Sequence, residues 1–340
     1  MKNAFLIARG SKWLAIVISS LVLSGCQSLA ISLTQHAMEN PATQQNVQRL
    51  THYANQNVQH PLQVARDVRY GDLPNSRMDI IVPQQHNNKH YPVIVLVHGG
   101  GWVAGNKESM LPYAKLLADR GFAVVNMEYS RVPQSAFPTQ LRQLNQVLTS
   151  LKALSYPSLD LNRLFLSGDS AGANIVSNYA AFVNSPILQH QLAITPAIRA
   201  QQLKGLVLHS GVYDMASLYQ SGSRLPWYTR WIMQDLLNAY SGENPASLRR
   251  LYAMSATPWL TTHYPPVWIS ASDNDLLTSG QSRPFIQRLQ QLKVPVDIHL
   301  YPQQWPEPLN HDFEFNLRYR ASREVLEYSV EFIKQHSKSM

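Results

Sequence analysis

The 340-residue chain has one cysteine, no run of basic residues and no apolar run long enough to cross a membrane, and each shortage excludes a class of protein. With 45% apolar residues over this length, a sizeable core can form, which excludes both a disordered chain and a small disulfide-stabilised domain. Neither an H-E-x-x-H motif nor paired cysteines occur. The sequence therefore predicts no metal site, and it contains no motif that implies a cofactor.

The formal charge of +8 suggests a polyanion as partner, but the distribution of the basic residues does not support one. Lys2, Arg9 and Lys12 lie in the first 25 residues, which contain no acidic residue, and without this segment the charge falls to +5. The remaining basic residues are scattered and form no Lys/Arg run of the kind that binds phosphates. We therefore expect no nucleic acid partner.

The N-terminus has the pattern of a secretory signal peptide over residues 1–25. Basic residues precede an uncharged run from Trp13 to Leu23, which is too short for the roughly 20 residues that cross a bilayer. The following Leu23-Ser24-Gly25-Cys26 resembles the lipobox of bacterial lipoproteins, whose cysteine receives a diacylglyceryl group. Gln27 then favours the outer membrane in that resemblance. The alternative is an ordinary signal peptide with an accidental cysteine.

The mature chain divides into two parts in the sequence. Residues 26–65 are rich in Gln, Asn, Thr and His with few apolar residues, which predicts a lipid-anchored tether that can include a short helix. From residue 66 to residue 340, short apolar runs such as Val93–Val97 alternate with helical patterns. This alternation predicts an α/β domain with a mostly parallel sheet and helices on both faces. Residues 214–265 contain no strand-like run, and we expect them to form a helical cap insertion over the site.

Two glycine-rich segments follow predicted strands, where sites in such sheets lie. Ser170 lies in Gly168-Asp169-Ser170-Ala171-Gly172, between a strand and a helix, which is the position of an exposed nucleophile rather than of a plain turn serine.

The second segment, His98-Gly99-Gly100-Gly101-Trp102, can direct backbone N–H groups at a developing oxyanion, together with the amide of Ala171. A phosphate-binding loop would need a Lys-Ser/Thr or a G-x-G-x-x-G spacing that is absent. We expect His98 to brace this loop rather than to act as a base.

Two further segments after strands supply a candidate acid and base. His311 lies in the loop before the last helix, where a hydrolase of this kind has its general base, although a surface histidine is the alternative. Asp273 and Asp275 compete as the acid that orients it, and Asp275 could instead cap the following turn. The order of serine, acid and histidine is that of an α/β-hydrolase.

Between about Tyr70 and Phe332 the chain resembles the hormone-sensitive-lipase-like carboxylesterases, including bacterial acetyl- and feruloyl-esterase-like relatives. The motifs HGGGW, GDSAGAN, SGVYD and HDF carry the likeness. It implies an α/β-hydrolase fold, a catalytic serine, aspartate and histidine, and oxyanion donors at Gly100, Gly101 and Ala171. A gapless match of Ser272-Asp273 favours Asp273 as the acid, with Asp275 left open. Asp312 replaces the usual glycine after the histidine, and Ser130 replaces an arginine.

The predicted function is a serine carboxylesterase that cleaves small-molecule esters through an acyl-enzyme and is anchored to the outer membrane through Cys26, on its periplasmic or surface side. Five aromatic residues of the predicted cap would favour short to medium acyl or aryl esters if some of them line the pocket: Trp227, Tyr228, Trp231, Tyr240 and Tyr252. The alternatives are an inactive hydrolase-fold lipoprotein that binds a partner or glycan, and a serine amidase or acyltransferase.

Overall fold

The computed structural model describes residues 29–84, 90–154, 156, 158–221 and 226–338. The predicted signal peptide, the lipid-anchored Cys26 and Gln27 lie outside these residues. Among the described residues, no helix combines the length and apolar character needed to cross a membrane.

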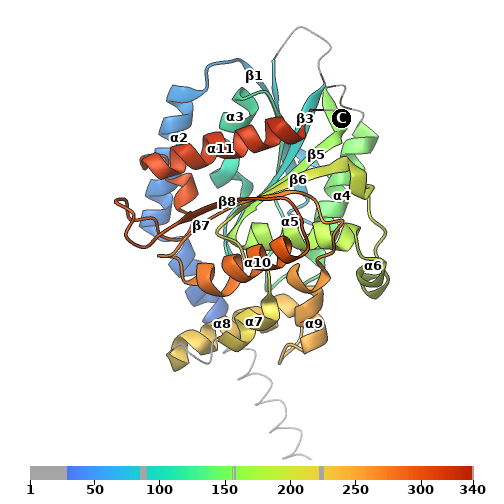
Figure 1. Ribbon diagram of the computed structural model, residues 1–340, viewed down its shortest axis with the longest axis vertical. Helices are drawn as coiled ribbons and strands as arrows, with labels where there is room; N and C mark the ends of the chain where they lie inside the picture. Colours follow the sequence, from blue (N-terminus) through green and yellow to red (C-terminus); the bar gives the residue numbers. More distant parts are fainter. Residues whose placement is uncertain (1–28, 85–89, 155, 157, 222–225, 339–340) are drawn as a thin grey trace, which may run out of the picture.

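The described residues form an eight-stranded sheet in the order β1-β2-β4-β3-β5-β6-β7-β8 (Figure 1). β1 pairs antiparallel with β2, and β2 pairs antiparallel with β4. The pairings β4-β3, β3-β5, β5-β6, β6-β7 and β7-β8 are all parallel. The strands are β1 (Leu62–Arg69), β2 (Arg77–Pro83), β3 (Tyr91–Val97), β4 (Ala123–Met127), β5 (Leu159–Asp169), β6 (Leu203–His209), β7 (Val267–Ser272) and β8 (Val296–Tyr301). The predicted mostly parallel sheet is confirmed.

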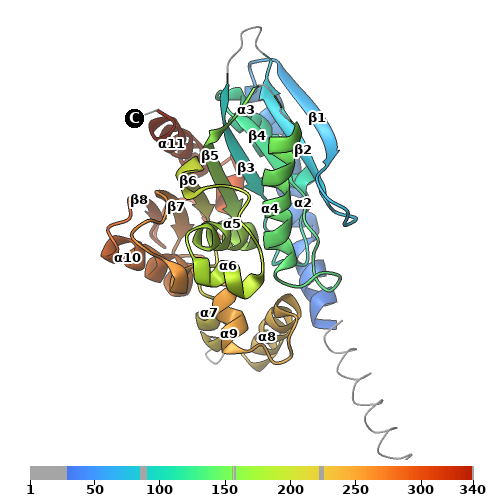
Figure 2. The ribbon, with the colours of Figure 1, turned by 90° about the vertical axis from the view of Figure 1, so that its right-hand side faces the viewer.

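Helices cover both faces of this sheet, as predicted (Figure 2). They are α2 (Pro41–Asn57), α3 (Lys107–Asp119), α4 (Thr139–Leu154), α5 (Ser170–Val183), α6 (Pro186–Leu192), α7 (Met215–Ser221), α8 (Trp227–Ser241), α9 (Leu248–Ala253), α10 (Arg283–Gln291) and α11 (Arg320–His336).

The apolar strands create a separate core on each face of the sheet. Every residue of β3 is buried, because a central parallel strand is covered on both sides. Successive side chains point to opposite faces, so Val93, Val95 and Val97 pack with α4 and α5. Ile94 and Leu96 pack instead with α2, α3 and α11. This layering fixes the edge of the sheet at which the carboxyl ends of the parallel strands meet.

The segment predicted as a tether is folded over much of its length, so that prediction is wrong for residues 29–57. Residues 29–38 are helical, and α2 follows with Asn40 as its N-cap, whose side chain accepts a hydrogen bond from the Thr43 amide at 3.1 Å. Leu50 and Ala54 of α2 are buried with residues of α3 and α11. The apolar residues of this segment are few, but Leu50 and Ala54 are spaced to make one narrow helical stripe, and a narrow stripe suffices for a helix that lies on the surface.

Residues 214–265 contain α7, α8 and α9, which lie together at one end of the molecule (Figures 1 and 2). This group of helices follows the carboxyl end of β6 and is therefore on the side of the sheet where a site is expected. Tyr240 of α8 is buried, and its ring stacks on Trp102 of the HGGGW loop with 4.5 Å between ring centroids. The cap thus supports the glycine loop from outside.

Candidate active site

Ser170 lies at the sharp turn where β5 ends and α5 begins. Its φ of 49° is in the left-handed region, which a residue with a side chain rarely adopts. The turn is tight because the flanking glycines let backbones approach: a Cβ on Gly172 would lie 2.1 Å from the carbonyl oxygen of Val97, and one on Gly168 would lie 2.6 Å from the carbonyl carbon of Gly172. Such a strained turn presents the serine side chain above the end of the sheet.

The structure brings the predicted serine and histidine into hydrogen-bond contact. His311 lies in the loop after β8, and its Nε2 is 3.0 Å from Ser170 Oγ. Its Nδ1 is 2.7 Å from Oδ2 of Asp275, which is 7% exposed. Ser170 O–H can therefore donate to His311, whose other ring N–H donates to Asp275. This relay is the arrangement that activates a serine hydroxyl as a nucleophile.

The choice of Asp273 as the acid partner of His311 is wrong, and Asp275 takes that position. The Asp273 carboxylate is bound by Arg283 at the start of α10, with Nη2 at 2.7 and 2.8 Å from its two oxygens. Asp275 also has the alternative role named for it, capping of the turn, since its Oδ1 accepts a hydrogen bond from the Leu277 amide at 2.9 Å. The two interpretations of Asp275 were treated as alternatives, but each uses a different carboxylate oxygen.

Three further acidic side chains surround the histidine. Asp312 Oδ2 lies 3.4 Å from His311 Nε2, and Asp312 has a φ of 57°, a conformation that aspartate and glycine tolerate. Asp169 Oδ1 accepts a hydrogen bond from the Gly99 amide, and Glu314 Oε1 accepts one from Ser270. Burial, followed by the charge of Asp312, raises the pKa of Glu314 to about 8. The same two causes raise the pKa of Asp169 well above its ordinary value.

This acidic environment favours the protonated form of the histidine. Desolvation opposes the charge of His311, whose side chain is 38% exposed, but the charge of Asp312 and the hydrogen bond to Asp275 outweigh it and raise the pKa of the imidazole to about 10. A general base must be neutral to accept a proton, so activity should increase with pH through this pKa. The acid limb of the kcat/KM profile is therefore expected well above the ordinary histidine value of 6.5.

We expect Asp312→Asn to shift that acid limb toward lower pH. The substitution removes a negative charge close to His311, and a charge at this distance changes a pKa by roughly one to three units. Asparagine keeps the side-chain shape and tolerates a positive φ. The measurement is kcat/KM against pH, with Asp273→Asn as the control that removes a carboxylate paired elsewhere. An unchanged acid limb in Asp312→Asn would refute the influence of this carboxylate.

The glycine loop lies beside Ser170 with unengaged backbone donors. Gly100 has a φ of 109° and Gly101 a φ of 56°, and a Cβ on Gly100 would lie 2.2 Å from the carbonyl oxygen of Ala104. Within the described residues, the amides of Gly100 and Gly101 donate no hydrogen bond. Ala171 is the second residue of α5, where helix amides have no intrahelical acceptor. These three N–H groups remain the candidate oxyanion donors.

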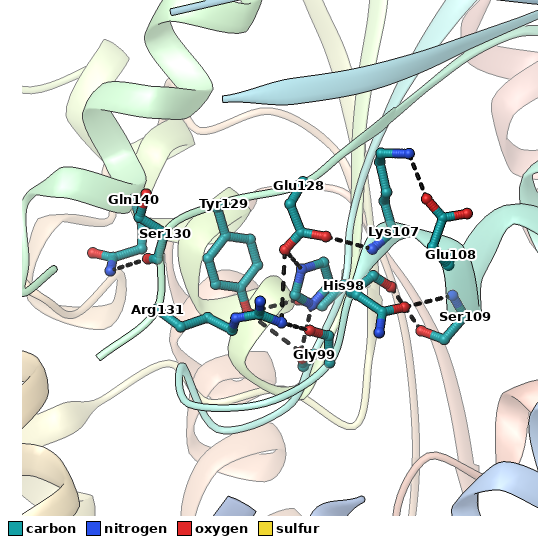
Figure 3. A network of polar contacts seen from close by, with 12 residues as sticks. His98, Gly99, Lys107, Glu108, Ser109, Glu128, Tyr129, Ser130, Arg131 and Gln140 are labelled. Atoms are coloured by element: carbon teal, nitrogen blue, oxygen red, sulfur yellow. Dashed lines mark hydrogen bonds and ion pairs between the residues drawn. The ribbon is translucent and has the colours of Figure 1, made fainter. Parts of the chain in front are cut away.

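His98 braces the glycine loop in the structure, as predicted. Its Nδ1 is 2.7 Å from the carbonyl oxygen of Gly99, its Nε2 is 3.2 Å from Glu128 Oε1, and its ring stacks on Tyr129 at 4.2 Å (Figure 3). Glu128 Oε2 accepts a hydrogen bond from the Lys107 amide at 3.0 Å. Burial opposes ionisation of Glu128, but the hydrogen bond and charge of His98, the Lys107 amide and the charge of Arg131 together outweigh it and lower the pKa of the carboxyl. Glu128 thus ties the two ends of the loop together.

Arg131 directly follows Ser130, the position at which the resemblance has an arginine. Its guanidinium donates to the carbonyl oxygen of Gly105. It also lies 3.8 Å from Glu128 Oε1 (Figure 3). The cation is therefore present one residue later in the chain and acts on the same loop.

Because Glu128 positions the loop, we expect Glu128→Gln to lower kcat about tenfold with little change in KM. Loss of a whole oxyanion donor costs roughly a hundredfold or more, and a displaced loop weakens the donors without removing them. Glu108→Gln is the matched control, since Glu108 belongs to the same network through Lys107 Nζ at 2.6 Å but does not contact the loop (Figure 3). An equal effect of both variants on kcat would contradict this role.

A cavity of about 310 Å³ opens beside Ser170 and His311. One side of its wall comes from the N-terminal helix and α2, through Met38, Thr43, Asn46, Val47 and Leu50. The other lining residues are His98, Gly99, Gly100, Gly105, Ser109, Met110, Asp169, Asp312 and Phe315. None of the five cap aromatics is among them, so the condition under which they would select the substrate is not met in this cavity. In the described part of the chain, no group of three or more His, Cys, Asp or Glu side chains is arranged to hold a metal ion.

The sequence of residues 40–54 contains weak helix signals for this part of the cavity wall. Asn40 followed by Pro41 is an N-cap and first-turn pair that marks the start of a helix. Val47, Leu50 and Ala54 then follow at helical spacing. The glutamine-rich composition between them concealed this pattern.

Comparisons with known proteins agree with this fold and geometry. The profile of the BD-FAE family matches residues 78–289, which is more than half of the chain. A rice protein (Oryza sativa subsp. japonica) named "Probable isoprenylcysteine alpha-carbonyl methylesterase ICMEL1" is 26% identical over 242 residues, which cover 70% of this chain and 56% of that protein. Kynurenine formamidase of Salmo salar is 29% identical over 154 residues, 45% of this chain and 47% of the relative.

Among solved structures, esterase B of Lactobacillus rhamnosis, inhibited by a C6-C4 SN3 compound, superposes with a TM-score of 0.76. The two chains are 19% identical, and the match covers 91% of this chain and 97% of the esterase. This likeness confirms the predicted α/β-hydrolase fold. The chain spans only about half of the length of the two sequence relatives.

Proposed function

The chain belongs to the BD-FAE family, and from this premise we propose that it is a serine hydrolase that cleaves carboxylic esters. The observation that carries the proposal is the hydrogen-bonded relay from Ser170 through His311 to Asp275 at the edge of a cavity. The names of esterases among the related sequences and folds support it.

In the proposed mechanism, Ser170 Oγ attacks the ester carbonyl while His311 Nε2 takes the hydroxyl proton. Asp275 holds the imidazole through Nδ1 and stabilises its positive charge. The amides of Gly100, Gly101 and Ala171 donate to the oxyanion of the tetrahedral intermediate. His311 then protonates the departing alcohol, which leaves an acyl-enzyme, and a water molecule activated by the same histidine hydrolyses it.

The cavity supports an ester of short to medium length as substrate. About 310 Å³ is at the lower end of the range for small-molecule sites. Met38, Val47, Leu50, Met110 and Phe315 give the cavity an apolar side. The sequence led to the same substrate class through the cap aromatics, whereas the lining itself comes from other elements.

A panel of p-nitrophenyl esters from acetate to palmitate, with one acetylated sugar and one aryl amide, tests this proposal. We expect kcat/KM to be highest for short or medium chains and to fall for palmitate, whose chain exceeds the cavity. The similarity to a formamidase favours amide hydrolysis as the second candidate function. Faster turnover of the amide than of every ester would replace the first candidate with the second.

For location, we propose a lipoprotein of the outer membrane that is anchored through Cys26. The support is the basic start, the uncharged run from Trp13 to Leu23 and the lipobox-like sequence before Cys26. The expected result is incorporation of a palmitate analogue into the expressed chain and its loss in Cys26→Ser. Equal incorporation in both would contradict the anchor.

A further inference from the structure

Three aromatic residues of the cap, Trp227, Tyr228 and Tyr252, lie neither in the core nor in the cavity. Trp227 at the start of α8 is 79% exposed and Tyr228 is 53% exposed, and their rings meet edge to face at 6.0 Å. Tyr252 of α9 is 45% exposed. We define the cap pole by the large exposed apolar residues of α8, α9 and the N-terminal helix: Trp227, Tyr228, Leu248, Tyr252, Leu29 and Leu33.

These elements lie at one end of the molecule. Both views place the first residues of the N-terminal helix beside α8, with α7 and α9 at the same end (Figures 1 and 2). Met38 and Leu236 of α8 both approach Gly101, within 2.8 and 3.8 Å of where its Cβ would be. From that common point the N-terminal helix runs back to Leu29, and α8 runs back to Trp227.

We propose that the cap pole is the surface through which the protein contacts a phospholipid bilayer. The inference deepens the proposed location and rests on the lipid anchor at Cys26. Cys26 precedes Leu29 by three residues, which span at most about 10 Å of extended chain. A lipid on Cys26 therefore enters the membrane close to the cap pole and not at a distant face.

The chemistry of the surface fits this occupant. Trp and Tyr combine an apolar ring with a polar group and concentrate at the interface between hydrocarbon and water. Exposed Arg230 on α8 and Arg249 on α9 lie near them and can meet anionic headgroups. The carboxyl ends of the strands, and with them Ser170, then face the bilayer side, where esters dissolved in the membrane would arrive.

The test uses the full-length, lipid-modified chain, whose single native thiol is blocked by the anchor. One new cysteine is introduced by Tyr228→Cys or, as the matched control, by Leu154→Cys. Leu154 is 43% exposed at the end of α4, beside the amino end of β5 and thus at the opposite edge of the sheet. Each thiol carries a nitrobenzoxadiazole fluorophore, and the protein is bound to phosphatidylethanolamine/phosphatidylglycerol vesicles that contain spin-labelled acyl chains.

We expect the label at position 228 to lose roughly half of its emission to the spin-labelled lipid, because interfacial side chains reach the boundary between headgroups and acyl chains. The label at position 154 should be unaffected. Equal emission from both positions on vesicle-bound protein would overturn the proposal. If the label at position 228 loses the same emission on vesicles without spin-labelled lipid, a second copy of the chain covers the surface. That result would also overturn the proposal.

The lipid anchor, the ester hydrolysis and the membrane contact of the cap pole are each tested by a separate measurement. If mass spectrometry finds Cys26 unmodified, the measurement is repeated in a Cys26→Ser background, and quenching at position 228 would then support the surface without the anchor. If the Cys26→Ser protein does not bind vesicles, both the anchor and the membrane contact of the cap pole are overturned. Ester hydrolysis measured on the same labelled samples reports on the proposed function alone.

Discussion

Replacing Ser170 with alanine is expected to lower kcat for a short p-nitrophenyl ester by about 10⁶-fold. The variant keeps the cavity and the candidate oxyanion donors but loses the atom that attacks the carbonyl. Because Ser170, His311 and Asp275 act as one unit, removal of the nucleophile costs nearly as much as removal of all three. The measurement is steady-state turnover, with the residual rate compared with that of the ester in buffer.

Ser177→Ala is the matched control for this variant. Ser177 lies on the same helix, is fully buried and donates its hydroxyl hydrogen bond to the Asn174 carbonyl oxygen at 3.2 Å. We expect its effect on kcat to be small, since it touches no reacting group. A Ser170→Ala protein that is folded and retains wild-type turnover would eliminate the mechanism.

The second large effect is expected from Asp275→Asn, with a loss of about 10⁴-fold in kcat. An amide at this position can donate to His311 Nδ1 and so favour the tautomer that carries its proton on Nε2, which cannot accept the proton of Ser170. The missing negative charge also leaves the imidazolium of the transition state without its partner.

Asp273→Asn is the informative comparison, because it makes the same chemical change two residues away. Its carboxylate is bound to Arg283 and does not reach His311, so we expect kcat to change by no more than a few fold. Kinetics of the two variants at matched pH distinguish the aspartates. A larger loss in Asp273→Asn than in Asp275→Asn would show that the orienting acid was assigned wrongly from the structure.

The sheet and the reacting serine and histidine were predictable because local patterns determine them. Buried parallel strands such as Val93–Val97 leave a continuous apolar run, and the strand-turn-helix context of Ser170 is visible in its flanking glycines. The topology brings the carboxyl ends of the parallel strands together. Of the twelve histidines, His311 is the candidate base because it lies in a loop that follows a strand.

The acid was missed because side-chain direction within a turn is not encoded in spacing. Asp273 and Asp275 stand two residues apart after the same strand, and a partner for Asp273 appears only when α10 folds back with Arg283. Asp312 was noticed as a departure from the usual glycine, yet its effect on the pKa of His311 depends on the contact between them in the folded chain.

The cavity wall and the role of the cap were missed for a different reason. A helix with only Leu50 and Ala54 buried has little apolar signal of its own and is stabilised by the surface on which it packs. The cap aromatics gave a strong signal, but composition does not distinguish a ring that fills a core, such as Tyr240, from one that is exposed, such as Trp227. Only their exposure in the folded chain separates these roles.

The most direct test of the account is covalent labelling with a p-nitrophenyl alkylphosphonate, followed by mass spectrometry of the digested protein. The phosphorus mimics the ester carbonyl, so attack should displace p-nitrophenol and leave one phosphonyl group on Ser170. We expect that single adduct in the wild type and in Asp273→Asn, and much slower labelling in Asp275→Asn. An adduct on another residue, or full esterase activity in protein with Ser170 blocked, would contradict the central claim that this serine is the nucleophile.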